Sequence, residues 1–179
     1  MAGTGGSGGQ TGAGGATSST GGQTTSSGGT APANLILDPN FSAVEAYWSA
    51  TANSGEAATL SCSAGQCCVT NEYATWFAFS LGYPRSSLQA FTVQGGATYA
   101  LSFRASGSSV NRLEVKVGKA VDPYTTIYSG LVTVAPSMSQ YSLQFTPSAT
   151  DTTAGLVFNV ELAEYGSVCF SSISLAKNP

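Results

Sequence analysis

The chain has 179 residues, enough for one domain with a substantial core, and only 8% of them are charged, with a net charge of −3. Nucleic acids and anionic membranes are recognised by clustered cations, so we expect neither as a partner. Histidine is absent, which excludes a Ser–His–Asp or Cys–His mechanism and removes the commonest zinc ligand.

Residues 1–33 contain only Gly, Ala, Ser, Thr, Gln, one Pro and the initial Met. Such a segment has almost no apolar surface to bury and cannot offset the entropy of ordering. We therefore expect a flexible, disordered linker at 1–33 and one folded domain at 34–179. The irregular mixture of glycine with threonine and serine favours a natural tether to a catalytic or anchoring domain over a cloning sequence. Because no basic or apolar leader opens the chain, we expect it to come from within a longer protein.

From residue 34 onward, short stretches alternate between apolar and polar residues, which is typical of half-buried strands. No stretch has a convincing helical period. About ten strands fit the pattern, which predicts an all-β domain, a two-sheet antiparallel β-sandwich of the jelly-roll type. The segments that support it are 34–37, 66–73, 87–93, 99–103, 113–117, 141–145, 156–162 and 167–175.

The four cysteines, Cys62, Cys67, Cys68 and Cys169, are an even number in a domain that looks secreted, which favours two disulfides. Cys67 and Cys68 are neighbours on a predicted strand, so they should point to opposite faces and take different partners. The pairing we favour is Cys68–Cys169 with Cys62–Cys67. The spacing does not match a zinc knuckle, so we do not expect a metal there.

Three segments carry a family resemblance: residues 34–41 read NLILDPNF, residues 88–103 read LQAFTVQGGATYALSF and residues 168–175 read VCFSSISL. In this order they resemble the NLxxNxxF, LxxxVxxxGxTYxLxF and xCxDDVxL segments of the jelly-roll carbohydrate-binding modules of families four, nine and twenty-two. The resemblance spans 34–176. It implies a structural, buried Trp48 and a disulfide at the positions of Cys68 and Cys169, which agrees with the pairing above.

The chain departs from the family at positions where acids often help to hold a structural calcium ion. Ser171 and Ser172 stand in the closing strand, and Ser42 follows the opening one. Calcium prefers carboxylate oxygens, so hydroxyls and backbone carbonyls would have to replace them here. We therefore expect no cofactor, with structural calcium left as an open alternative.

A sugar site needs flat aromatic faces for the rings. Trp76 is the first candidate for ring stacking, because it faces outward if Phe77 and Phe79 face inward; the alternative is a place in the core. Tyr124 follows an Asp-Pro turn signal and matches a family Tyr beside the binding cleft. The alternative for Tyr124 is an ordinary surface tyrosine.

Polar side chains must match the hydroxyl rim of the sugar. Gln89, at the start of a predicted strand, and Asn159, pointing away from the core, match positions where the family uses amides. Glu114 is a further candidate, on the outward side of its strand. The alternative for all three is a solvated strand position.

The resemblance implies a secreted, monomeric, non-catalytic module that binds a β-1,4-linked plant polysaccharide, with amorphous cellulose or mixed-linkage glucan ahead of xylan. One alternative is a structural or adhesive spacer, because a fold alone does not imply sugar binding. The other is a glycoside hydrolase, for which Glu114 and Glu161 could supply the two carboxylates.

Overall fold

The computed structural model describes residues 32–52, 59–63, 65–75 and 77–179. Nearly all of the linker expected at 1–33 lies outside these residues, so the linker and the domain boundary stay predictions. Trp76 also lies outside them.

The described residues form nine strands and two short helices, which confirms the all-β prediction. Neither helix, α1 or η1, is long and apolar enough to cross a membrane. The strands and helices are α1 (Val44–Tyr47), β1 (Ser49–Ala52), β2 (Thr59–Ser63), β3 (Gln66–Thr70), β4 (Phe77–Tyr83), η1 (Ser87–Gln89), β5 (Phe91–Val93), β6 (Tyr99–Lys119), β7 (Thr126–Val132), β8 (Ser139–Phe145) and β9 (Asp151–Lys177).

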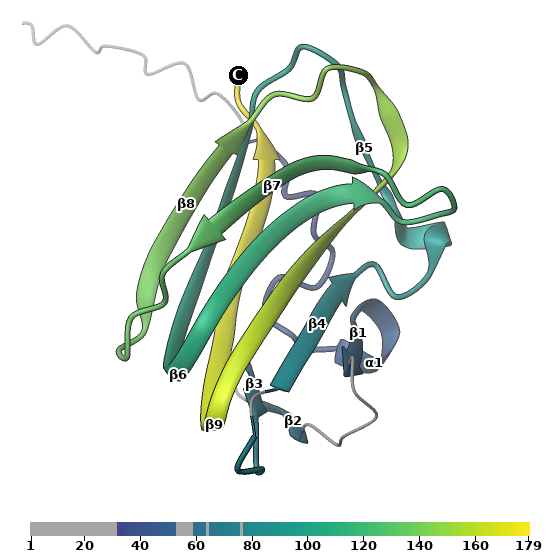
Figure 1. Ribbon diagram of the computed structural model, residues 1–179. Coiled ribbons are helices and arrows are strands. Elements are labelled where there is room, and N and C mark those ends of the chain that lie inside the picture. The colour runs from purple at the N-terminus through teal and green to yellow at the C-terminus, as the bar shows by residue number, and fades with distance from the viewer. Residues whose placement is uncertain (1–31, 53–58, 64, 76) are drawn as a thin grey trace, which may run out of the picture. The chain divides into compact units, whose positions relative to one another are not determined.

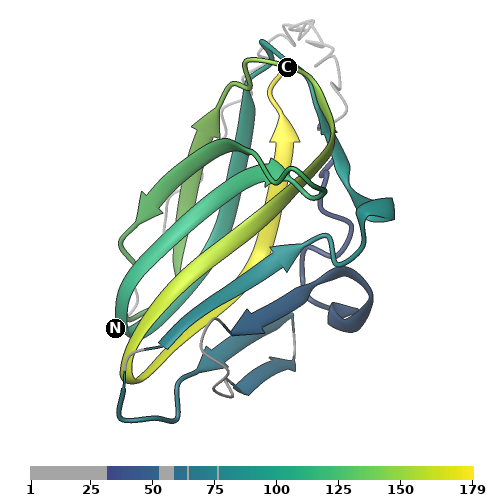
Figure 2. The same cartoon turned by 45° about the vertical axis from the view of Figure 1, so that its right-hand side comes forward.

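The strands pack as a β-sandwich in which β6 and β9 run through both layers (Figures 1 and 2). The first half of β9 pairs with β4 and with the second half of β6, and β1 and β7 flank these strands to complete the front sheet. The second half of β9 pairs with β3 and with the first half of β6, and β2 and β8 complete the back sheet. All pairs are antiparallel, and β5 pairs with the start of β9.

Both long strands turn from one sheet to the other at the same end of the sandwich. Ser109 in β6 and Tyr165 in β9 have φ angles of 53° and 51°, in the left-handed region that bends a strand sharply. The buried side chain of Asn71, which follows β3, donates to the carbonyl oxygen of Ala163 at 2.9 Å. The amide therefore ties the loop that leads into β4 to the bend of β9.

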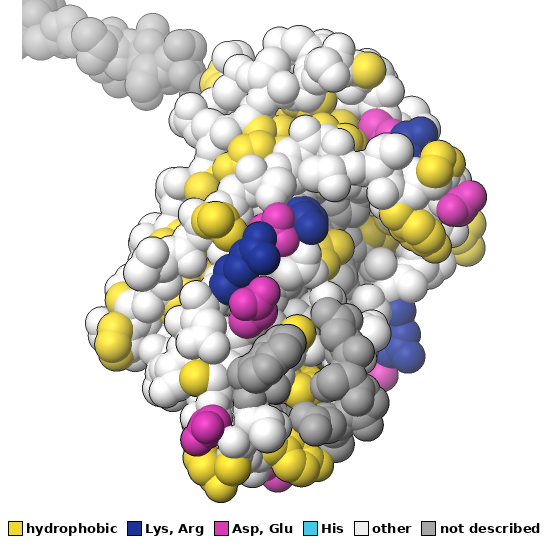
Figure 3. All heavy atoms as spheres, in the orientation of Figure 1, with side chains coloured by type: hydrophobic (Ala, Val, Ile, Leu, Met, Phe, Trp, Pro, Cys, Tyr) yellow, Lys and Arg dark blue, Asp and Glu magenta, His cyan; other side chains and the backbone are white. Residues whose placement is uncertain are grey.

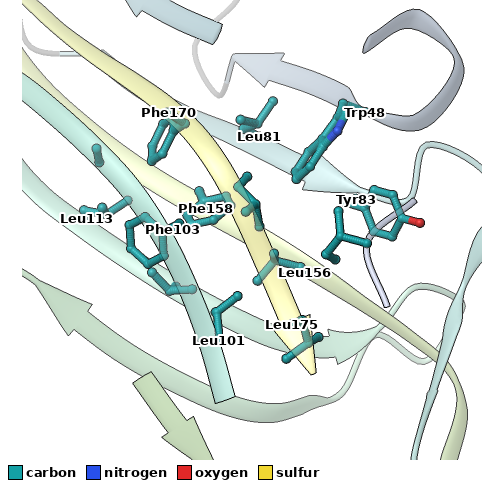
Figure 4. Packing of buried hydrophobic residues seen from close by; sticks show 14 of the residues in the cluster. Trp48, Leu81, Tyr83, Leu101, Phe103, Leu113, Leu156, Phe158, Phe170 and Leu175 are labelled. Atoms are coloured by element: carbon teal, nitrogen blue, oxygen red, sulfur yellow. The ribbon is translucent and has the colours of Figure 1, made fainter. Parts of the chain in front are cut away.

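The apolar positions of the alternating segments face the space between the two sheets, as predicted (Figure 4). Phe103, Phe158 and Phe170, from both layers, contact one another there. Trp48 is 1% exposed, and its indole N–H donates to the carbonyl oxygen of Asp38 at 3.0 Å. The prediction of a buried Trp48 is therefore confirmed, with its one polar group satisfied.

Both predicted disulfides are present, Cys62–Cys67 within the β2–β3 hairpin and Cys68–Cys169 between β3 and β9. Cys67 is buried on the inner side of β3, whereas Cys68 lies on the outer side opposite Cys169 in the ladder. The alternation of a strand therefore separates the two neighbours as expected.

Two expectations about strands are wrong. Residues 34–37 form no strand, because the side chain of Asn34 replaces part of a ladder: its oxygen accepts from the N–H of Leu175, and its amide donates to the carbonyl of Ile173. Gln89 does not begin a strand; it ends η1, which Ser86 caps by accepting from the N–H of Leu88. The described residues contain nine strands, close to the expected number of about ten.

Candidate functional site

A row of hydrogen-bonded polar side chains crosses four adjacent strands on the outer face of the front sheet. Ser129 of β7 donates to Glu114 Oε1 of β6 at 2.7 Å, and Asn159 Nδ2 of β9 lies 3.4 Å from Glu114 Oε2. Ser80 of β4 donates to Asn159 Oδ1 at 2.9 Å. We call these four residues the polar row. They face outward because their strand neighbours, such as Leu113 and Phe158, are in the core.

Charged side chains flank the row. Glu114 Oε2 lies 3.1 Å from Lys116 Nζ and 3.7 Å from Arg112 Nη2, and Arg112 Nη1 lies 3.5 Å from Glu161. Figure 3, which looks onto this face, shows blue and magenta side chains gathered at its centre. The two cations offset the two carboxylates, so the row presents mixed donors and acceptors with little net charge.

Glu114 is held as a carboxylate. Its partial burial, which would raise its pKa, is outweighed by hydrogen bonds from Ser129, Lys116 and Asn159, and the pKa lies below its ordinary value. A general acid in a glycosidase needs a raised pKa instead. Glu114 is therefore set up as a permanent hydrogen-bond acceptor.

A hollow of about 280 Å³ lies on the same face beside the row, and we call it the tyrosine hollow. Gly82, Gly118 and Gly155 contribute to its lining, and Tyr124, which is 75% exposed, stands at its wall. Gly118 and Gly155 lie opposite each other in the ladder. A Cβ at Gly118 would lie 2.7 Å from the carbonyl oxygen of Thr125, so a side chain there would displace the loop that carries Tyr124.

A second, smaller hollow of about 60 Å³ lies at the other side of the row. Ala78, Arg112 and Glu161 line it together with Glu114 and Asn159 of the row itself. The polar row therefore lies between two depressions that follow one another along β6 and β9.

The structure brings three of the residues predicted from the sequence onto this face: Glu114, Asn159 and Tyr124. Gln89 lines neither hollow, and its Oε1 is buried without a hydrogen-bond partner among the described residues. The first candidate for stacking, Trp76, lies outside the described residues. Whether any of these side chains contacts a ligand stays a prediction.

Sequence reasoning missed Ser80, Ser129 and the glycines of the tyrosine hollow. A signal was present in β4, where Ala78, Ser80 and Gly82 alternate with large apolar residues. Because every outward-facing residue of β4 is small, this part of the sheet has free space above it. Ser129 has no such signal, because its role depends on the pairing of β7 with β6.

The alternative of a structural calcium ion stays a prediction, because here it depends on hydroxyl and backbone oxygens. The described side chains contain no group of three or more acidic, cysteine or histidine residues placed to hold a metal ion. Both oxygens of the buried Asp38 carboxylate already accept hydrogen bonds from the protein. Oδ1 accepts from the N–H and the hydroxyl of Ser42 at 2.7 Å each, and Oδ2 accepts from the N–H of Ala43 at 3.0 Å. These hydrogen bonds hold the segment that leads into α1 in place.

The sequence model of the family described as "Carbohydrate binding domain", which covers types 4 and 9, matches residues 33–166. The chain therefore belongs to this family of carbohydrate-binding domains. A comparison with curated proteins finds no match.

Solved structures with this fold agree with the jelly-roll resemblance. A CBM4 structure is 22% identical with a TM-score of 0.58, over 75% of this chain and 96% of that one. The N-terminal cellulose-binding domain of β-1,4-glucanase C from Cellulomonas fimi is 22% identical with a TM-score of 0.53, over 74% and 89%. TmCBM61, solved with β-1,4-galactotriose, is 14% identical with a TM-score of 0.51, over 82% and 99%.

Proposed function

We propose that the domain binds a single chain of a β-linked plant polysaccharide on the outer face of the front sheet, without catalysis. Amorphous cellulose or mixed-linkage glucan is the first ligand class and xylan the second. The observation that carries the proposal is the polar row between its two hollows. A sugar ring has a hydroxyl rim that needs both donors and acceptors, and the row offers a carboxylate, an amide and two hydroxyls.

In this proposal Asn159 and Glu114 bond sugar hydroxyls, and Tyr124 stacks on an apolar ring face. The names of the similar structures support the ligand class, because one is a cellulose-binding domain and another is in complex with a β-1,4-linked galactotriose. Stacking on Trp76 and hydrogen bonding by Gln89 stay predictions from the sequence. The depression along the strands favours one chain over a flat crystalline surface.

We further propose that the protein is secreted and acts as a monomer. Two disulfides in one small domain support an oxidising compartment. The linker predicted at 1–33 would tether the domain to a catalytic or anchoring domain, which raises the effective concentration of that partner at its polysaccharide.

The test is electrophoresis through native gels that contain hydroxyethyl cellulose, barley β-glucan, xylan, laminarin or no polymer. We expect retardation by a β-1,4-linked polymer, weakened in Asn159→Ala and Tyr124→Ala variants by about fivefold or more in affinity, as for central contact residues. A Trp76→Ala variant in the same gels tests the prediction that Trp76 stacks on a sugar ring. Tyr165→Ala is the matched control, because Tyr165 is 66% exposed at the bend of β9.

Retardation that persists in both site variants would move the binding site away from the polar row. If no polymer retards the protein and insoluble cellulose and chitin do not capture it, the proposal is wrong, and a spacer or adhesive role takes its place.

A further inference from the structure

The charged residues that line the tyrosine hollow are cations, in a chain that is negative overall. Two lysines, Lys116 and Lys119, are among its lining residues, and no acidic side chain is. The whole chain has only six Lys and Arg residues against nine Asp and Glu. Two of its six cations therefore border one hollow whose floor is glycine and whose wall is an exposed tyrosine.

The ammonium group of Lys119 is only weakly engaged by the protein. Its nearest carboxylate oxygen, Asp151 Oδ2, lies 3.9 Å away, beyond hydrogen-bond distance. Lys119 Nζ makes no hydrogen bond with a described residue, and its side chain is 37% exposed. Asp151 is held elsewhere, because its Oδ1 accepts from the N–H and hydroxyl of Thr153 at 2.7 and 2.9 Å.

The backbone fixes where this cation lies. The N–H of Lys119 donates to the carbonyl oxygen of Thr125 at 2.9 Å, so the end of β6 is bonded to the residue after Tyr124. Lys116 is two residues beyond the polar row on β6 and pairs with Glu114 at 3.1 Å, which leaves it further N–H donors. Both lysines are therefore lining residues of the hollow that Tyr124 and the three glycines also line.

We propose that the tyrosine hollow binds a sugar unit that carries a carboxylate, a uronic acid within the chain or as its side group. The inference rests on the proposed function and narrows it to acidic polysaccharides. The ring lies against Tyr124 above the glycine floor, and the carboxylate accepts hydrogen bonds from Lys119 and Lys116. The volume of about 280 Å³ suits one sugar unit, at the lower end of ligand pockets.

The overall charge of the protein makes the proposal testable. A chain with a net charge of −3 repels a polyanion, so a preference for an acidic polymer must come from a local site.

The experiment compares one β-glucan in three forms: neutral, carboxylated at C6 and sulfated. Affinities are measured at low salt and at high salt for the wild type, Lys119→Gln and Lys177→Gln.

Lys177→Gln is the matched control. It removes the same charge from the back sheet, where Lys177 donates to Gln94. Thermal unfolding of both variants verifies that each is folded. We expect the carboxylated glucan to bind the wild type about threefold to fivefold more tightly than the neutral form, the range of a partly exposed ion pair. High salt should abolish this ratio, Lys119→Gln should lower it toward the contribution of Lys116 alone, and Lys177→Gln should retain it.

Equal affinity for the neutral and carboxylated forms, or a preference that Lys119→Gln leaves unchanged, would overturn the inference and leave the proposed function standing. The same gain for the sulfated form would overturn the assignment to a carboxylate. Failure of all three forms to bind the wild type would overturn the proposed function itself, so the two failures are distinguishable.

Discussion

The buried amide of Asn71 gives the sharpest prediction about what stabilises the fold. Asn71 is 1% exposed, and its Nδ2 donates to the carbonyls of Thr75 and Ala163 at 2.6 and 2.9 Å. Its Oδ1 accepts from the N–H of Tyr73 at 3.0 Å. An Asn71→Ala variant leaves all three backbone groups without this partner. At about 1 kcal/mol for each, the variant should lose roughly 3 kcal/mol of unfolding free energy.

Such a loss is a large fraction of the roughly 5–15 kcal/mol by which domains are stable. Urea denaturation followed by tryptophan fluorescence measures it, with the slope of the transition used to verify that unfolding stays two-state. Asn111→Ala is the control, because Asn111 is exposed and its side chain bonds no described residue. The control should change stability by no more than about 0.5 kcal/mol. The reasoning is refuted if Asn71→Ala is as stable as Asn111→Ala.

Two further predictions concern the disulfides and the polar row. Replacing Cys68 and Cys169 by serines should cost about 4–5 kcal/mol, and replacing Cys62 and Cys67 only about 2, because the first bridge closes a much longer loop; equal losses in urea denaturation would contradict this. Because the folded pKa of Glu114 lies below the ordinary value of 4.5, its contribution to stability is complete above 4.5 and is lost only as the pH falls through the lowered pKa. Glucan affinity depends on the same carboxylate in the folded protein, so it should be flat from about pH 5 to 8 and decline only as the pH falls through the lowered pKa of Glu114. A decline that begins near pH 6 would show that another group controls binding.

The sequence predicts the part of the fold that depends on alternation alone. Period-two segments identify the core positions, and neighbouring cysteines on one strand imply partners on opposite faces. The same pattern cannot tell that residues 99–119 form one strand, because the bend at Ser109 depends on a backbone conformation that serine rarely adopts. The pattern at 34–37 likewise predicts a strand that does not form, because the side chain of Asn34 supplies hydrogen bonds that a strand would make with its backbone.

The site is less predictable than the core, because it depends on register. Glu114 and Asn159 are predicted from the sequence as single residues, but only the pairing of β6 with β9 sets them opposite each other. Ser129 enters the row through the register of β7, and no local feature marks that serine. The tyrosine hollow depends on a loop, residues 120–125, whose path the alternation of its flanking strands does not specify.

The position of β9 has a consequence for how the domain folds. This strand follows all the others in the sequence, yet it lies in the interior of both sheets, between β4 and β6 in one and between β3 and β6 in the other. Until it has been synthesised, β3 and β4 lack the neighbour on which they pair, and most contacts that form later join distant parts of the chain. Folding with such a topology is slow, on the order of milliseconds to seconds. Hairpins such as β2–β3 and β6–β7 can pair earlier, but the two sheets cannot be completed until this last strand has been synthesised.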